Sequence, residues 1–282
     1  MSRPNGPLTI CVINLKGGVG KSTISALLAR HAFLRRDLDV LTVDLDPQAN
    51  LSQALMGSDY NDFLTEKRPS IVEIFDGYRP PSPKNPSPGP LSLKDAAETI
   101  SQIGNRSLQL IPSRFDFSDN LTKSVRPDSK VLARFLSNEF RHKDIIIIDC
   151  SPTESILTHA AYHASGLVLV PVKPEYFATI GFPLLQQSLE SFRAENRGHT
   201  ITVAGVVINN AFYHGGNDGG PEKARALNQI KAEAGSNKWK IFSNQIPFSR
   251  GFPKLMRGDY SFSGNAVLFP RFADEFLTAI GA

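Results

Sequence analysis

The sequence predicts an α/β fold, a single domain with a mostly parallel, twisted sheet and helices on both of its faces. Short apolar runs rich in valine and isoleucine alternate with helical stretches along the chain. These runs are apolar at consecutive positions, which is typical of strands that are buried on both faces. Strands and helices that alternate in this order form parallel sheets covered by helices.

The predicted strands lie at 8–14, 40–46, 108–112, 145–149, 166–170 and 201–208. Helical patterns, in which apolar residues recur every three or four positions, lie at about 24–34, 71–75, 93–97, 128–141, 155–164, 179–195, 221–234 and 272–280. The last pattern is acidic on its polar side, which predicts a helix packed on the body of the protein.

Composition is that of an ordinary globular chain of 282 residues, 41% hydrophobic and 21% charged. No apolar run approaches the roughly 20 residues that span a bilayer, and residues 1–7 lack the apolar region of a signal peptide. Cys11 and Cys150 lie in or beside predicted buried strands, which predicts free core cysteines in a reducing, cytoplasmic compartment. We expect a single domain over 1–282.

A proline-rich stretch at 79–90 holds six prolines in twelve positions. Such a run cannot form a helix or an inner strand, so it predicts an exposed, extended loop. This loop is either a solvated insertion between two short helices or a docking segment for a proline-binding partner.

The most informative motif follows the first predicted strand and opens the first helix. It reads Lys16-Gly17-Gly18-Val19-Gly20-Lys21-Ser22-Thr23. Apart from Lys16 in the place of the first glycine, this is a phosphate loop, in which backbone N–H groups surround a polyphosphate. Lys21 would bring charge to the β- and γ-phosphates, and Ser22 would offer a hydroxyl to Mg²⁺. One lysine suffices for one nucleotide, so Lys16 is free to reach a nucleotide held by a second subunit.

Two carboxylates end the second predicted strand. Asp44 and Asp46 are two positions apart, so strand alternation predicts that both project to the same side, toward the phosphate end of the sheet. Alternatively, they are structural carboxylates that accept hydrogen bonds from loop amides.

Four segments resemble the ParA/MinD group of P-loop ATPases, and ParA in particular. The phosphate loop resembles the deviant Walker A motif, K-G-G-x-G-K-[ST]-T. The other three segments resemble the family's V-D-x-D-P-Q-x-N segment, its Walker B strand with the following turn, and its P-V-x-P-E-x-F-A segment; they lie at 43–50, 144–152 and 171–178. Leu15, where many relatives carry Gln, and Ser151-Pro152 in place of Pro-Pro depart from the pattern.

The resemblance implies a Mg²⁺-dependent ATPase that binds ATP and Mg²⁺ as cofactors. Its nucleotide would contact Lys16, Gly17, Gly18, Val19, Gly20, Lys21, Ser22 and Thr23, with Thr23 at the α-phosphate. Ser22, Asp44 and Asp149 would serve the metal, Asp149 by holding one of its waters. The catalytic residues would be Asp46, which orients or deprotonates the attacking water, together with Lys16 and Lys21.

Asn209 closes a predicted strand at the sheet edge where open α/β proteins bind nucleotides. Its amide can contact an adenine edge, with Pro247 as part of a second wall, although Asn at a strand end is also a frequent turn former. By contrast, His142, His159, His163, His199 and His214 show no metal-like spacing.

The final third, at 221–271, is basic, with nine Lys and Arg against three acidic residues, while the whole chain carries a net charge of only +4. A concentrated basic surface suits sequence-independent contact with DNA phosphates, although a solvated face is an equally open reading of composition alone. The candidate DNA contacts are Lys223, Arg225, Arg250, Lys254 and Arg257.

By resemblance, the expected function is DNA partition or cargo positioning. An ATP-dependent homodimer would bind DNA non-specifically, associate with the nucleoid, and be released when a ParB-like or other adaptor protein stimulates hydrolysis. No helix-turn-helix segment precedes the first strand, so the chain is similar to the short ParA forms. Two alternatives stay open: a MinD-like ATPase that cycles on a membrane, and a metabolic P-loop ligase or small-molecule kinase. We expect no membrane partner, and the cargo has no readable motif.

Overall fold

The computed structural model describes residues 6–78, 93–117, 128–175, 181–210, 220–258, 260–262 and 264–282. The proline-rich stretch predicted at 79–90 and residues 176–178 of the fourth family-like segment lie outside these described residues.

A seven-stranded sheet forms the centre of the described chain, in the order β3-β4-β2-β5-β1-β6-β7. All neighbouring pairs are parallel except β3 with β4. The strands are β1 (Leu8–Val12), β2 (Val40–Asp44), β3 (Glu98–Ile103), β4 (Arg106–Ile111), β5 (Ile145–Asp149), β6 (Leu167–Val172) and β7 (Thr202–Ile208). The predicted mostly parallel sheet is therefore confirmed, and the antiparallel edge strand β3 is the strand that the prediction missed.

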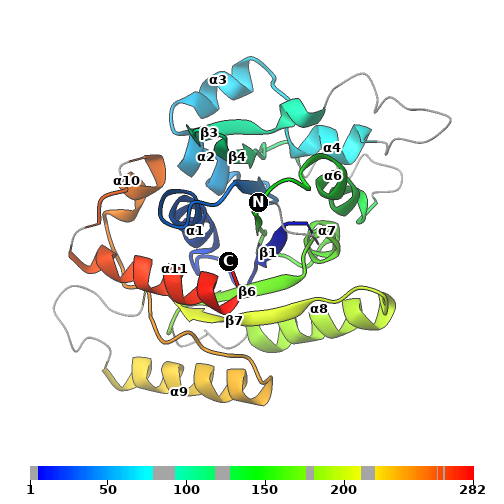
Figure 1. Cartoon of the computed structure of the whole chain (residues 1–282). Coiled ribbons are helices and arrows are strands. Elements are labelled where there is room, and N and C mark those ends of the chain that lie inside the picture. Colours follow the sequence, from blue (N-terminus) through cyan, green and yellow to red (C-terminus); the bar gives the residue numbers. More distant parts are fainter. Residues whose placement is uncertain are drawn as a thin grey trace.

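Helices cover both faces of this sheet (Figure 1). Alternate residues of β1 divide between the faces, Cys11 and Ile13 toward one core and Ile10 and Val12 toward the other. The first core is covered by α4 (Ile71–Gly77), α6 (Val131–Glu139), α7 (Ile156–Ala164), α8 (Gly181–Glu195) and α9 (Gly220–Ser236). The second core is covered by α1 (Lys21–Arg35), α10 (Phe252–Arg257) and α11 (Leu268–Ala279). Strands buried on both faces explain why the strand runs are apolar at consecutive positions.

Two short helices, α2 (Asn50–Met56) and α3 (Asp59–Thr65), enclose a third, smaller core beside α1. The 3₁₀ helix η1 (Leu93–Ala96) precedes β3, and a second one, η2 (Gly264–Val267), precedes α11. The sequence patterns did not predict α2, α3 or α10.

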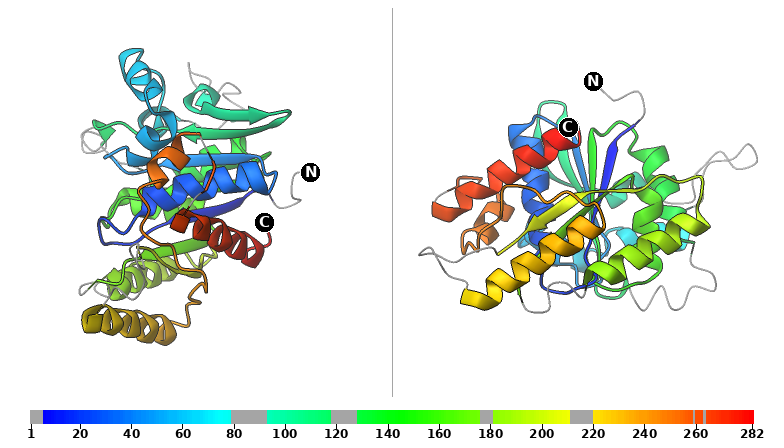
Figure 2. Two further views of the ribbon diagram at one scale, coloured as in Figure 1. Left: turned by 90° about the vertical axis from the view of Figure 1, so that its left-hand side faces the viewer. Right: turned by 90° about the horizontal axis from the view of Figure 1, so that it is seen from below.

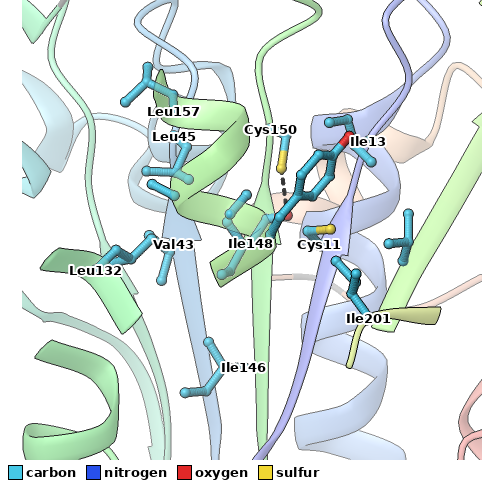
Figure 3. Close-up of a cluster of buried hydrophobic side chains, with 14 of the residues drawn as sticks. Cys11, Ile13, Val43, Leu45, Leu132, Ile146, Ile148, Cys150, Leu157 and Ile201 are labelled. Carbon is cyan, nitrogen blue, oxygen red and sulfur yellow. Dashed lines mark hydrogen bonds between the residues drawn. The ribbon is translucent and has the colours of Figure 1, made fainter. Parts of the chain in front are cut away.

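Both cysteines are free and buried, as predicted. Figure 3 shows Cys11 and Cys150 among the aliphatic side chains of the first core. The Cys150 thiol donates a weak hydrogen bond to the carbonyl of Ile148 at 3.8 Å, and burial raises the pKa of that thiol well above its ordinary value. Both cysteines therefore serve as small core residues.

The C-terminal helix α11 packs on the body of the protein, as its acidic polar side predicted. Phe269, Phe272, Phe276 and Leu277 are fully buried in the second core. On its polar side, the Asp274 carboxylate accepts a hydrogen bond from His31 Nε2 at 2.9 Å. None of the helices in the described part of the chain combines the length and apolar character needed to cross a membrane.

His163 gives the fold a pH-dependent stability. Its ring packs edge-on against Phe192, with centroids 4.8 Å apart, and burial, followed by the positive groups Lys130 and His199, lowers its pKa to about 4. Between about pH 6.5 and 4 the unfolded chain therefore binds a proton that the folded chain does not, so stability falls as the pH falls through this window.

We expect His163→Gln to reduce the change in unfolding free energy between these pH values by about 1–2 kcal/mol. This is less than the whole pKa shift implies, because solvent screens the half-buried ring. Urea denaturation at a series of pH values measures this slope. His142→Gln, at an exposed ring, is the matched control. Equal slopes in wild type and His163→Gln would contradict the assignment.

Candidate nucleotide-binding site

The predicted phosphate loop connects β1 to α1 at the carboxyl edge of the sheet. Gly18 and Gly20 adopt φ angles of +72° and +92°, a region in which glycine carries no Cβ penalty. Helix α1 begins at Lys21, directly after Gly20. The N–H groups of its first turn therefore face the loop, as an anion-binding helix N-terminus requires.

Two asparagines from outside the loop hold it in place. Asn209 Nδ2 donates to the carbonyl of Val19 at 2.8 Å. Asn14 Oδ1 accepts from the backbone N–H of Lys16 at 3.0 Å, and its Nδ2 donates to the carbonyl of Pro171 in β6 at 2.8 Å. Both asparagines are almost fully buried. The loop is therefore tied on one side to β6 and on the other to the end of β7.

The side-chain N–H₂ group of Asn209 thus donates a hydrogen bond to the loop, a contact that the sequence did not predict. A Cβ atom added to Gly20 would lie 2.1 Å from Asn209 Nδ2. Pro247 is buried and follows Ile246, which bridges to Asn209. The base contacts predicted for Asn209 and Pro247 stay predictions.

A cleft of about 510 Å³ opens beside the loop. It brings together most of the predicted loop residues with one predicted catalytic carboxylate. It is lined by Gly17, Gly18, Gly20, Lys21, Ser22, Thr23, Asp46, Gln48, Asn50, Ala54, Pro152 and Met256. Six of the residues predicted for the nucleotide, the metal or catalysis do not line it, namely Lys16, Val19, Asp44, Asp149, Asn209 and Pro247.

Lys21 is only 6% exposed although it lines the cleft. Its Nζ donates to the carbonyls of Asn14 and Lys16, each at 3.2 Å. Burial lowers the pKa of the Lys21 ammonium, and the carboxylates of Asp149 and Asp46 oppose that shift. The lysine is thus folded back onto the start of the loop, where its ammonium binds the carbonyl groups of Asn14 and Lys16.

Asp149, at the end of β5, fits a role beside a divalent cation. It is fully buried, and its Oδ1 accepts from Ser25 Oγ at 3.2 Å. Its Oδ2 has no hydrogen-bond partner among the described residues. Burial and the neighbouring Asp44 raise the pKa of Asp149 well above its ordinary value, while a hydrogen bond from Ser22 and the charge of Lys21 oppose the shift.

A buried carboxylate with an unpartnered oxygen suits Mg²⁺, which proteins bind through one or two carboxylates together with phosphates and waters. Within the described ranges, no group of three or more His, Cys, Asp or Glu side chains could hold a metal ion alone.

Asp44 and Asp46 have different surroundings. Asp46 lines the cleft, but Asp44 does not. Asp44 Oδ1 accepts from the N–H of Asp46 at 3.1 Å, and Oδ2 accepts from the N–H and hydroxyl of Ser52 at 2.8 and 2.7 Å. Leu45 lies with Leu41 and Val43 in the first core, so the alternation of β2 continues past its last residue, and the common direction of Asp44 and Asp46 stays a prediction.

Asp44 therefore holds the segment between Asp46 and Ser52 in place, which is the structural alternative that the sequence left open. Its complete burial raises its pKa to about 7, against the opposing hydrogen bonds from Ser52. Its predicted part in Mg²⁺ binding stays a prediction.

Lys16 points away from the cleft. Its Nζ forms an ion pair with Glu175 Oε2 at 3.3 Å, and Lys173 lies 3.4 Å from the other oxygen of the same carboxylate. The hydrogen bond and charge of Lys16, with the charge of Lys173, lower the pKa of Glu175 against the effect of burial. Lys16 is thus held within its own protomer and is not committed to the cleft beside it.

The candidate DNA contacts fall on two separate elements. Lys223 and Arg225 lie on α9, beside α8, whereas Lys254 and Arg257 lie on α10, beside α1, with Arg250 in the segment that precedes it. Figures 1 and 2 show α9 apart from α10. The basic final third is therefore not one continuous patch within a protomer.

Sequence reasoning missed some of the residues that line the cleft. Gln48, Asn50 and Pro152 belong to segments already matched to the family, so their motifs could have identified them. Met256 had no such signal, because α10 reaches the cleft from far along the chain. Asn14 was assigned only to a strand, although it holds the loop.

A larger cavity of about 820 Å³ lies at the opposite edge of the sheet and is lined by residues that include Thr9, Ile146, His163 and His199. It contains no phosphate loop and none of the predicted site residues. The smaller cleft is therefore the candidate site, because it combines the loop, the buried lysine and an acidic side chain.

This fold and this site define a P-loop nucleotide-binding protein of the deviant Walker A type. A family model for an AAA domain matches residues 8–201. The chain is 30% identical over 204 residues to the sporulation initiation inhibitor protein Soj of Bacillus subtilis, a match that covers 71% of each chain. It is also 30% identical over 204 residues to the chromosome partitioning protein ParA of Myxococcus xanthus, with 71% of this chain and 63% of that protein covered. The chain belongs to the ParA family of P-loop ATPases.

Solved structures show the same fold at lower sequence identity. The Cyanothece McdA–ATP complex has a TM-score of 0.75 at 19% identity, with 98% of this chain and 97% of that chain covered. Cobyrinic acid a,c-diamide synthase from Mycobacterium smegmatis, bound to an ATP analog and magnesium, has a TM-score of 0.69 at 21% identity, with coverage of 95% and 93%. The fold is thus shared by McdA, solved with ATP, and by a synthase solved with an ATP analog and magnesium.

Gly20→Ala should destabilise the ligand-free protein by about 1–3 kcal/mol, because the added methyl group meets the Asn209 amide and the residue keeps a positive φ. Urea denaturation without nucleotide measures the loss. Gly17→Ala in the same loop is the matched control, since nothing lies within 4 Å of its added Cβ and its φ is not positive. Equal stability of the two variants would show that Asn209 does not fix the loop.

Proposed function

We propose that this protein is a partition or positioning ATPase that dimerises when it binds ATP, binds DNA non-specifically, and is released when an adaptor protein stimulates hydrolysis. The observation that carries the proposal is the division of labour between two lysines. Lys21 lies inside the cleft with Asp46, whereas Lys16 lies outside it on the surface beside the same loop. An ATPase that worked only within one protomer would not need the second lysine.

ATP and Mg²⁺ are the cofactors of this site. Lys21 and the N–H groups at the start of α1 would bind the β- and γ-phosphates, and Ser22 and Asp149 would hold the metal with its waters. The bound metal would neutralise charge on the phosphates during transfer. Relatives of the same fold, McdA with ATP and the diamide synthase with an ATP analog and magnesium, support this choice.

Asp46 would orient the attacking water. Its Oδ1 accepts from the N–H of Gln48 at 3.0 Å, which fixes the carboxylate at the wall of the cleft. Phosphoryl transfer depends mostly on positioning and charge neutralisation, so one well-held carboxylate is enough for this task.

Lys16 would bind the phosphates of the partner's nucleotide in the dimer. To do so it must leave Glu175, and the two side chains of that pair are 26% and 54% exposed. Ion pairs of such exposure contribute about 0–1 kcal/mol, so a polyphosphate competes with Glu175 easily.

DNA is the proposed surface partner, through Arg250, Lys254 and Arg257 near α10 and through Lys223 and Arg225 on α9. A dimer would double both groups and extend the basic surface, and the complex would place the protein on the nucleoid. A ParB-like or other adaptor is the proposed trigger for hydrolysis. The curated relatives Soj and ParA support this assignment over a metabolic ligase, which the fold alone does not separate.

The membrane-cycling alternative is disfavoured by the packing of α11. A membrane-targeting helix presents its apolar face to the bilayer, whereas the apolar face of α11 is buried against α1 and the sheet.

Asp46→Asn should keep ATP binding but reduce hydrolysis by at least about 100-fold, because the water loses its orienting carboxylate. Fluorescent ATP binding and phosphate release measure the two quantities. Trapped in the ATP state, this variant should co-sediment with DNA and not with anionic vesicles. Binding to vesicles alone would favour the membrane alternative, and unchanged turnover would refute the role of Asp46.

Lys16→Ala should stay monomeric with ATP and Mg²⁺ while it still binds ATP, because the contact to the partner's phosphates is lost. Size-exclusion chromatography with light scattering gives the mass. Lys173→Ala, which removes the other lysine beside Glu175, should still dimerise and serves as the control. A Lys16→Ala protein that dimerises like wild type would remove the proposed contact.

A further inference from the structure

The short helix α10 is part of the wall of the nucleotide cleft. Met256, near its C-terminal end, lines the cleft together with Thr23, Asn50 and Ala54. The Met256 side chain is half-buried and packs against both the core beneath α1 and the small core beneath α2. A nucleotide in the cleft would therefore contact α10 directly, through a side chain that is wedged between two cores.

A buried arginine ties α10 to the helix that begins in the phosphate loop. Arg30, on α1, is 3% exposed, and its Nε donates to the carbonyl of Met256 at 2.5 Å. A buried guanidinium that loses its acceptor is costly, because no water replaces the hydrogen bond. Displacement of α10 relative to α1 is therefore opposed unless Arg30 moves with it.

The chain just after α10 is tied to the same face of α1. The Tyr260 hydroxyl lies 3.0 Å from His31 Nδ1 and 3.4 Å from the carbonyl of Leu27. Leu27, Arg30 and His31 are three or four positions apart or adjacent, so they lie on one face of α1. This face holds α10 at Met256 and the chain after α10 at Tyr260.

The opposite side of α10 carries two of the candidate DNA contacts. Lys254 and Arg257 are exposed, whereas Phe252 and Leu255 are buried in the second core. The six-residue helix α10 thus presents the apolar side chain of Met256 to the nucleotide cleft and two basic side chains to the surface.

We propose that α10 transmits nucleotide occupancy from the cleft to the basic surface, and that Arg30 is the positioning residue that maintains this link. The inference rests on the proposed function, because it assigns DNA as the partner of the α10 surface. Linkage makes the effect reciprocal: if ATP raises the affinity for DNA, DNA raises the affinity for ATP by the same factor.

Arg30→Gln tests the link, with Arg36→Gln as the matched control. Arg36 follows α1 and binds Asp274, Thr278 and the carbonyl of Ala282, so it connects α1 to the C-terminal segment and not to α10. Fluorescence anisotropy with a labelled DNA duplex gives the dissociation constant with and without Mg²⁺-AMPPNP. The ratio of these two constants is the coupling.

In wild type and Arg36→Gln we expect a ratio of about 10 or more, and in Arg30→Gln a ratio within about 2-fold of one. Binding of AMPPNP to Arg30→Gln without DNA should stay within about 3-fold of wild type, because Arg30 does not line the cleft. A wild-type ratio in Arg30→Gln would overturn the proposal.

Amide hydrogen exchange tests the same link without DNA. In wild type, Mg²⁺-AMPPNP should slow exchange both in the phosphate loop and at 252–257, whereas in Arg30→Gln only the loop should be protected. If wild type binds no DNA, the proposed function fails, but the exchange experiment still decides whether α10 responds to the nucleotide. Equal protection of 252–257 in wild type and Arg30→Gln would refute the link.

Met256→Ala keeps the test decisive if Arg30→Gln does not fold. It removes the side chain at the cleft and leaves the backbone carbonyl that Arg30 binds. We expect the same loss of nucleotide-dependent protection at 252–257, and full protection in this variant would overturn the proposal.

Discussion

The site depends on a phosphate loop that is held open by hydrogen bonds to its own backbone. Asn14 and Asn209 fix the two sides of the loop, and Lys21 binds two of its carbonyl groups. These contacts satisfy groups that would otherwise be buried without partners, at the cost of a left-handed Gly20 that tolerates no side chain. The Lys21 ammonium is therefore already fixed at the loop, with two carbonyl oxygens as its acceptors.

The buried carboxylates Asp44 and Asp149 depend on the groups around them. Asp44 and Asp149 are directly paired in register on β2 and β5, and both are completely buried. Asp44 is stabilised by Ser52 and Asp46, whereas Asp149 has Ser25, Ser22 and the charge of Lys21. Like charges at this spacing raise each other's pKa. A divalent cation beside Asp149 would relieve that repulsion, which couples metal binding to the ionisation of the pair.

Much of the fold could be predicted because buried parallel strands are apolar at every position and the loop glycines have a fixed spacing. Strand β3 was missed because four of its six residues from Glu98 to Ile103 are polar and it lies at the sheet edge, although Gly104-Asn105 is a turn signal for a hairpin. Asp46 could be assigned from the family motif, whereas the hydrogen bonds of Asp44 to Ser52 depend on α2, which the sequence patterns did not predict. The contact between Arg30 and Met256 joins residues 226 positions apart, and no local pattern encodes it.

The two lysines of the loop can have different tasks because their surroundings differ. Lys21 is buried, lines the cleft of its own protomer, and its ammonium is held by the carbonyls of Asn14 and Lys16. Lys16 is half-buried and is paired with Glu175 on the outer side of the loop. An exposed pair of this kind stabilises the separate protomer only slightly, because water solvates both charges nearly as well. The fold therefore presents Lys16 in a defined place without a strong commitment to Glu175, which is what a contact made only after nucleotide binding requires.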